Sequence, residues 1–171
     1  MDLRELSKER IIISNLNPKD DGKKVVVAGW VYDDRDLGKI RFLVLRDFSG
    51  DIQITGLKGE TDEKVFKLMA SIPKESVIIV KGIVKKSPKA PGGREILPSE
   101  IEVLSKAEHP LPIDVSDFSK TELPKRLDYR FLDFHRRRTQ AIFKIQSTLM
   151  QGYREFMVQN GAIEANFPSI I

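Results

Sequence analysis

The stretch at residues 39–56, KIRFLVLRDFSGDIQITG, constrains the fold most, because it has the pattern of a β-hairpin. Two strand-like runs flank a tight turn whose sequence is Phe-Ser-Gly-Asp. Side chains alternate between the two faces of a strand, so each run divides into two sets. The set that suits a core is aliphatic: Leu43, Leu45, Ile52 and Ile54. The opposite set carries Phe42 and Gln53 outward, which places an aromatic ring beside an amide.

The surrounding sequence supplies further strands in an order that suits a small barrel. Apolar and alternating runs predict strands at residues 23–35, 40–48, 51–57, 76–85 and 95–104. Residues 62–71 have helical spacing and an acidic start, and Pro98 marks a bulge or an edge in the last strand. Five strands with a helix between the third and the fourth predict a mainly β fold, a closed barrel of the oligonucleotide/oligosaccharide-binding (OB) type. The alternative, a generic β-sandwich, needs more strands.

The sequence changes character after the fifth strand. Residues 106–125 are proline-rich and have no period, which predicts a hinge. Beyond the hinge, apolar residues recur at steps of three and four, and they predict a long amphipathic helix: Ile142, Ile145, Leu149, Tyr153, Phe156 and Met157. We therefore expect a barrel domain at residues 1–105, a hinge at 106–125 and the start of a second domain at 126–171. Such a helix must pack on the barrel, pair with another chain or open a domain whose remainder is missing.

Composition narrows the classes of function. The 171 residues carry a net charge of +4, two histidines and no cysteine, which excludes disulfides and thiolate metal sites. We expect no metal site, no membrane span and a cytoplasmic location, since no long apolar run or secretory signal is present. The mild positive charge permits a polyanionic partner. On charge alone, the two basic regions, around residues 85–94 and 125–138, are best interpreted as solvated surface.

An outward ring beside an outward amide, on a basic chain, suits the recognition of an unpaired base. The ring of Phe42 can stack on a base, and the amide of Gln53 offers both a donor and an acceptor. From the residues alone, a half-buried strand aromatic that meets a partner is an equally good interpretation of Phe42. The motifs and their order then add a resemblance. They are VVVAGWV (25–31), KIRFLVLRD (39–47), DIQITG (51–56), VKGIVKKSPKAPGG (80–93), HPLPIDV (109–115) and RLDYRFLDFHRRR (126–138).

Together these segments resemble the N-terminal part of class IIb aminoacyl-tRNA synthetases of the archaeal and eukaryotic aspartyl type. The resemblance implies an anticodon-binding OB barrel, a hinge and the first helix and strand of a class II α+β catalytic domain. It implies that Phe42 stacks on an anticodon base and that Gln53 hydrogen-bonds the central uracil. It further implies that Arg35 contacts the anticodon backbone or a base, and that Glu95 accepts hydrogen bonds from a base.

The loop at residues 86–94 would close over the third anticodon position in this family. Lys85 and Lys89 would attract phosphate there. The choice between the aspartate and asparagine tRNAs would be made near Tyr32 and Pro91. A proline at position 91, instead of a lysine, resembles the relaxed enzymes that charge both tRNAs.

The last segment, at residues 154–171, resembles class II motif 1, whose helix and strand build the homodimer interface. The resemblance implies that Tyr153, Phe156 and the motif proline Pro168 lie at that interface. The copy departs from the family pattern at Ala162 and at the Asn-Phe pair before Pro168.

The resemblance also implies an activity for the full-length enzyme. That enzyme would be an aspartate–tRNA ligase that uses ATP and Mg²⁺ and forms aspartyl-adenylate. The residues that hold these groups lie after motif 1 in the family, so we expect no catalytic residue and no cofactor in this chain, which alone would be inactive. Two alternatives stay open. One is the N-terminal region of an asparaginyl-tRNA synthetase, and the other is a stand-alone, non-enzymatic OB module that binds tRNA or single-stranded nucleic acid.

Overall fold

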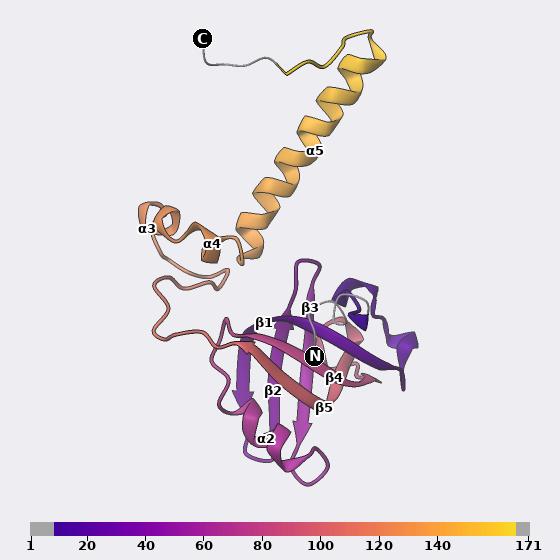
Figure 1. Ribbon diagram of the computed structural model, residues 1–171, viewed down its shortest axis with the longest axis vertical. Helices are drawn as coiled ribbons and strands as arrows, with labels where there is room; N and C mark the ends of the chain where they lie inside the picture. The colour runs from indigo at the N-terminus through magenta and orange to yellow at the C-terminus, as the bar shows by residue number, and fades with distance from the viewer. Residues whose placement is uncertain (1–8, 167–171) are drawn as a thin grey trace. The chain divides into compact units, whose positions relative to one another are not determined.

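The computed structural model describes residues 9–166, which fall into two compact units (Figure 1). The units are Met1–His109 and Pro110–Ile171, so their boundary lies within the stretch expected to be a hinge. No helix among the described residues combines the length and the apolar character that crossing a membrane requires.

The described part of the first unit contains five strands and the α-helix α2. The strands are β1 (Lys24–Asp36), β2 (Ile40–Arg46), β3 (Asp51–Leu57), β4 (Val77–Lys86) and β5 (Arg94–Ser105). Helix α2 (Glu63–Met69) lies between β3 and β4, and three short 3₁₀ helices occupy Ile13–Asn15, Pro18–Asp20 and Pro91–Gly93. The predicted five-stranded sheet with a helix between the third and fourth strands is confirmed.

The sheet closes on itself in the order β1-β2-β3-β5-β4. Every pairing is antiparallel except that of β3 with β5, which is parallel and joins Gln53 to Glu95 and Ile54 to Ile96. The register of β4 and β5 shifts where Gly82 pairs with Pro98, so the irregularity expected at this proline is present. A side chain at Gly82 would overlap the Leu97 carbonyl oxygen, which explains why the position carries a glycine.

The core of the first unit is aliphatic and is drawn from alternate strand positions. Leu43 is 1% exposed and Leu45, Ile52 and Ile54 are fully buried, as the alternation in the hairpin predicted. Helix α2 lies across one end of the barrel and adds Val65 to the same core (Figure 1). Burial of a side chain of this size contributes about 1.5–3 kcal/mol. One face of the hairpin therefore packs in the core, and the side chains of the opposite face can contact solvent or a ligand.

The β2–β3 turn is fixed by the carboxylate of Asp47. One oxygen accepts hydrogen bonds from the Ser49 hydroxyl at 2.6 Å and from the backbone N–H groups of Ser49 and Gly50 at 2.8 and 3.0 Å. The other oxygen accepts from the Ile13 N–H at 3.1 Å and from Arg10 at 3.3 Å. The side chain therefore joins the turn to the segment that precedes β1.

The second unit contains α3 (Leu123–Asp128), α4 (Arg130–Asp133) and α5 (Arg137–Gln159). A small cluster of Ile113, Val115 and Leu132 forms its apolar centre. The carboxylate of Asp133 is fully buried, and it receives Arg126 at 2.7 Å, Arg130 at 2.9 Å and Arg136 at 3.4 Å. The basic region around residues 125–138 is therefore not simply solvated surface, because these arginines have a buried partner.

Candidate nucleic-acid interface

A groove of about 490 Å³ runs across the barrel and receives side chains from all five strands. It is lined by Asp33, Asp34, Arg35, Ile40, Phe42, Val44, Gln53, Thr55, Leu57, Lys85, Ser87, Lys89, Pro91, Glu95 and Leu97. The structure thus brings together seven of the residues that the sequence singled out, namely Arg35, Phe42, Gln53, Lys85, Lys89, Pro91 and Glu95. Tyr32 is not among the lining residues.

Strand register explains how residues distant in sequence meet in this groove. Asp33 on β1 pairs with Val44 on β2, which pairs with Gln53 on β3. Gln53 pairs with Glu95 on β5, and Glu95 pairs with Lys85 on β4. Paired residues point to the same face of a sheet, so this row places an amide, an acid and a cation side by side.

Phe42 lies in the next row, where it pairs with Arg35 on one side and Thr55 on the other. It is partly exposed and lines the groove, whereas its neighbour Leu43 is 1% exposed and lies in the core. If the Phe42 ring were buried in the barrel core, it could not stack on a base. The observed position leaves the ring accessible to a flat ligand in the groove.

Three polar side chains form a hydrogen-bonded triangle in the groove. The Gln53 Nε2 donates to Glu95 Oε2 at 2.9 Å and lies 3.2 Å from Thr55 Oγ1. The Thr55 hydroxyl donates to the same Glu95 oxygen at 2.6 Å. Thr55 and Glu95 are buried, whereas Gln53 is partly exposed. The two buried side chains, Thr55 and Glu95, therefore hold the Gln53 amide in one orientation.

The rim of the groove carries charges of both signs. The cations Arg35, Lys85 and Lys89 are exposed, so they are available to phosphate. Burial raises the pKa of Asp33, but the hydrogen bond from Lys74 at 2.7 Å, the positive charges of Lys74 and Arg35 and a backbone hydrogen bond from Asp34 together outweigh it and hold the pKa below its ordinary value. Asp33 is thus an ionised group whose charge is largely matched by Lys74.

Sequence reasoning assigned no role to Asp33, Asp34 or Thr55. The signal for Thr55 was present, because it shares the outward face of β3 with Gln53. The two acids follow a regular strand pattern, but a register shift between Val31 and Asp33 determines which way they point. Such a shift has no clear signal in a single sequence.

Tyr32 lies against Arg46 instead of lining the groove. The Arg46 guanidinium sits 3.4 Å from the centroid of the Tyr32 ring and is paired with Asp51 at 2.8 and 3.1 Å. Burial lowers the pKa of Arg46, but the ion pair with Asp51 outweighs it and raises the pKa above its ordinary value. The ring is therefore held by a cation that is permanently charged.

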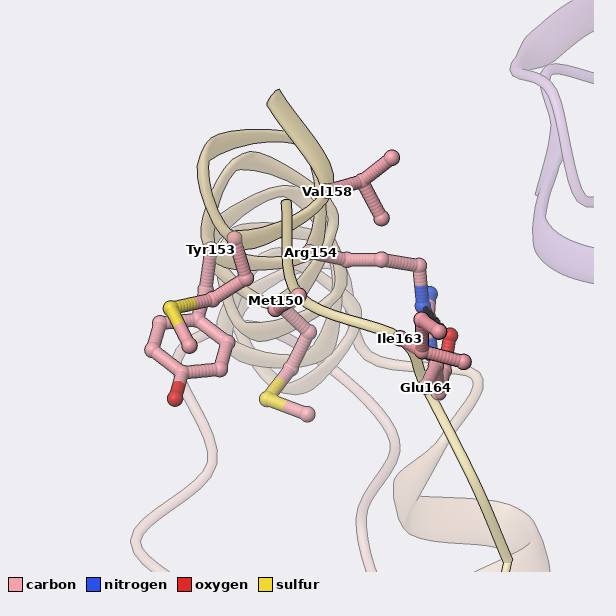
Figure 2. Close-up of a pocket in the computed structure, with 8 residues that line it drawn as sticks. Met150, Tyr153, Arg154, Val158, Ile163 and Glu164 are labelled. Atoms are coloured by element: carbon pink, nitrogen blue, oxygen red, sulfur yellow. Dashed lines mark hydrogen bonds and ion pairs between the residues drawn. The ribbon is translucent and has the colours of Figure 1, made fainter. Parts of the chain in front are cut away.

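The predicted interface residues of the second unit lie on the long helix α5. Tyr153 is 62% exposed and Phe156 is 63% exposed, whereas Pro168 lies outside the described residues. Beyond the helix the chain turns at Gly161, whose φ is 85°, and Ile163 and Glu164 return beside the last turns. Figure 2 shows Arg154 reaching Glu164, with which it forms two hydrogen bonds of 2.7 and 3.0 Å.

No group of three or more His, Cys, Asp or Glu that could hold a metal ion occurs within residues 9–166. The described residues of the groove offer stacking, hydrogen bonding and cationic contacts.

Comparisons with known proteins agree with this geometry. Residues 25–104 match the family profile of the OB-fold nucleic acid binding domain. The chain is 46% identical to the "Aspartate--tRNA(Asp/Asn) ligase" of Archaeoglobus fulgidus, over 95% of this chain and 38% of that protein. It is also 46% identical to the "Aspartate--tRNA(Asp) ligase" of Thermococcus kodakarensis, over 92% of this chain and 36% of that protein.

A solved structure has the same fold over almost the whole chain. The asparaginyl-tRNA synthetase of Pyrococcus horikoshii, complexed with asparaginyl-adenylate, superimposes with a TM-score of 0.85 at 34% identity. The match covers 94% of this chain and 36% of that one. The chain thus spans little more than a third of the length of these relatives. Residues 25–104 thus match the model of the OB-fold nucleic acid binding domain, and the chain is similar to archaeal aspartate–tRNA ligases over 92–95% of its own length.

Proposed function

We propose that this chain is the anticodon-binding part of an aspartate–tRNA ligase and that the groove binds the anticodon loop of tRNA. The observation that carries the proposal is the row Val44–Gln53–Glu95–Lys85 with Phe42 beside it, which places a ring, an amide, an acid and a cation on one face. The choice of aspartate as the amino acid rests on the names of the relatives.

In this proposal each part of the groove has a distinct task. Lys85 and Lys89 attract the phosphate backbone, which gives affinity without sequence preference. Phe42 stacks on one unpaired base, and stacking of this kind is worth about 1–3 kcal/mol. Gln53 and Glu95 then form hydrogen bonds with base edges, which supply the selectivity for sequence.

We extend the proposal to the full-length protein. It would activate aspartate with ATP and Mg²⁺ to aspartyl-adenylate and transfer the aspartyl group to the 3′ end of tRNA in the cytoplasm. The described residues would select tRNA, and α5 would contribute to a homodimer interface through Tyr153 and Phe156, with Pro168 beyond the helix as a further interface residue. The domain assignment of residues 1–105, 106–125 and 126–171 is part of the same proposal.

The selectivity between the aspartate and asparagine tRNAs is a separate property of the full-length enzyme. The two curated relatives with 46% identity carry different names, one for both tRNAs and one for the aspartate tRNA alone. Pro91 lines the groove, so it is placed to meet a base or its backbone. We propose that the full-length enzyme charges both tRNAs with aspartate. Aminoacylation of both transcripts tests this, and strict preference for the aspartate tRNA would refute it.

A titration of RNA binding tests the proposed function of the chain itself. The ligands are a stem-loop with the aspartate anticodon, the same stem with a scrambled loop and an unstructured RNA of equal length. We expect the first to bind at least tenfold more tightly than the second, because base contacts add to phosphate contacts. Equal affinity for all three would instead support a stand-alone module for single-stranded nucleic acid.

A further inference from the structure

We propose that Thr55 is a positioning residue that fixes the orientation of the Gln53 amide and so decides which base the groove accepts. The inference rests on the proposed function, since it concerns the same groove. It adds a residue to which neither the sequence motifs nor the comparisons assign a role. Thr55 is 5% exposed, so it acts mainly through the side chains above it.

The direction of each hydrogen bond in the triangle follows from the available protons. A carboxylate can only accept, so the short contact of 2.6 Å requires the Thr55 hydroxyl to donate its single proton to Glu95. Toward Gln53 the hydroxyl can then only accept. The amide nitrogen must therefore face both Thr55 and Glu95, as the contacts of 3.2 and 2.9 Å show.

This arrangement leaves the Gln53 amide oxygen on the side away from Thr55 and Glu95. Reversing the amide would set its oxygen against the Glu95 carboxylate, which is an unfavourable contact between two acceptors. Glu95 is 8% exposed, so little water is available to relieve that contact. The buried pair thus selects one of the two amide orientations.

The selected orientation has a consequence for base choice. A uracil presents an N3–H donor on its pairing edge, whereas a cytosine presents an N3 acceptor at the same place. An amide oxygen that faces the base can accept a hydrogen bond from the uracil N3–H, whereas it repels the N3 acceptor of cytosine. Without the Thr55 hydroxyl, Glu95 loses the 2.6 Å hydrogen bond that fixes its carboxylate against Gln53. The carboxylate can then move away, and Gln53 can rotate to offer its N–H group to cytosine.

The test uses the 171-residue chain and two anticodon stem-loops that differ only in a central uracil or cytosine. We expect the wild-type chain to prefer uracil by about tenfold, the effect of one unmade buried hydrogen bond. Thr55→Val removes the hydroxyl and keeps a β-branched shape, and it should reduce the preference below about threefold. Thr55→Ser restores the hydroxyl and should restore the preference.

A matched control separates positioning from loss of stability. The Thr61 hydroxyl oxygen also accepts a hydrogen bond in this unit, from the Leu57 N–H at 2.9 Å, but Thr61 does not line the groove. Thr61→Val should therefore leave the base preference unchanged even where it lowers the melting temperature. Circular dichroism confirms that each variant is folded.

A second readout needs no RNA. In NMR spectra of the free chain, the Gln53 side-chain amide protons should exchange slowly in the wild type and in Thr55→Ser, and at least fivefold faster in Thr55→Val. Unchanged exchange in Thr55→Val, or a base preference that persists in that variant, would overturn the inference while leaving the proposed function standing. A wild-type chain that binds neither stem-loop would refute the proposed function and the inference with it.

Discussion

At the scale of single residues, Phe42 and Leu43 show how one strand serves two purposes. Leu43 is buried in the core, and Phe42, one position earlier, lines the groove. The pleat of β2 forces this separation, because adjacent side chains point to opposite faces. A single aromatic ring can therefore be removed from the groove with little effect on the barrel beneath it.

Phe42→Ala tests the stacking role. We expect RNA affinity to fall by about 1–3 kcal/mol, the energy of one base stacked on an aromatic ring. Phe48→Ala is the matched control, since Phe48 is 62% exposed on the same hairpin and does not line the groove. Filter-binding titrations compare the two variants. Equal affinities for Phe42→Ala and the wild type would count against stacking.

Asp47 gives the barrel a dependence on pH. Burial raises its pKa, but hydrogen bonds from Ser49, Ile13 and Gly50 outweigh it and hold the pKa below the ordinary value. A lowered pKa in the folded state stabilises the protein above the unfolded value, about pH 4, and the stabilisation is lost as the pH falls through the folded value. Asp47→Asn should therefore lower the free energy of unfolding by about 1–3 kcal/mol at pH 7.

The difference between Asp47→Asn and the wild type should begin to shrink as the pH falls below about 4, because the unfolded Asp47 then takes up a proton. The charge contribution should be lost completely only below the lowered pKa of the folded state, where Asp47 is neutral in both states. Urea denaturation at a series of pH values measures it. Glu60→Gln, an exposed change of acid to amide in the same unit, serves as the control. A difference that stays constant from pH 7 to pH 3 would show that the Asp47 charge is not responsible.

At the scale of elements, the sequence predicted those features that depend on neighbouring residues. The hairpin of β2 and β3, helix α2 and the long helix α5 all follow from local periodicity. Seven groove residues were also predicted, although the argument for most of them was the resemblance and not their spacing. The triangle of Gln53, Thr55 and Glu95 was missed as a unit, because it depends on the parallel pairing of β3 with β5.

The arginine cluster around Asp133 was also missed, because its arrangement depends on the fold and not on neighbouring residues. A run of basic residues near one acid is typical of solvated surface, and only the fold reveals that the Asp133 carboxylate is buried. Burial raises the pKa of Asp133, but hydrogen bonds from Arg126 and Thr139 and the positive charges of Arg126 and Arg130 together outweigh it and hold the pKa below its ordinary value. The acid is therefore ionised, and it ties α3 and α4 to the start of α5.

Asp133→Asn should unfold this corner of the second unit. Removing one partner of a buried ion pair leaves the other charges uncompensated, which costs about 3–5 kcal/mol. Hydrogen exchange followed by mass spectrometry should show faster exchange in α3 and α4 and unchanged exchange in the barrel strands. Asp128→Asn, an exposed neighbour, is the control. Protection equal to that of the wild type would show that the cluster does not stabilise the unit.

At the scale of the whole molecule, the main feature is the apolar surface of α5, which the described residues leave exposed. Seven of its apolar side chains are more than half exposed in the described part of the chain: Ile142, Ile145, Leu149, Met150, Tyr153, Phe156 and Val158. Exposed apolar stripes of this kind mark protein–protein contacts. The proposed homodimer would cover this stripe with a second copy.

Sedimentation velocity tests the proposed dimer. The wild-type chain should associate as its concentration rises, and the double variant Tyr153→Asp with Phe156→Asp should remain monomeric, because burying the introduced charges is costly. Phe118→Asp is the control, since Phe118 is 92% exposed and is not part of the apolar face of α5. A wild-type chain that is monomeric at every concentration would contradict the dimer proposal.

The parallel contact between β3 and β5 has a consequence for protein synthesis. Gln53 and Glu95 are 42 residues apart along the chain, and only two registered pairs join their strands. Contacts between distant segments require loop closure and therefore form after local ones. A nascent chain on the ribosome can consequently form its hairpin early, yet the groove that we propose for anticodon binding is incomplete until β5 has emerged and docked.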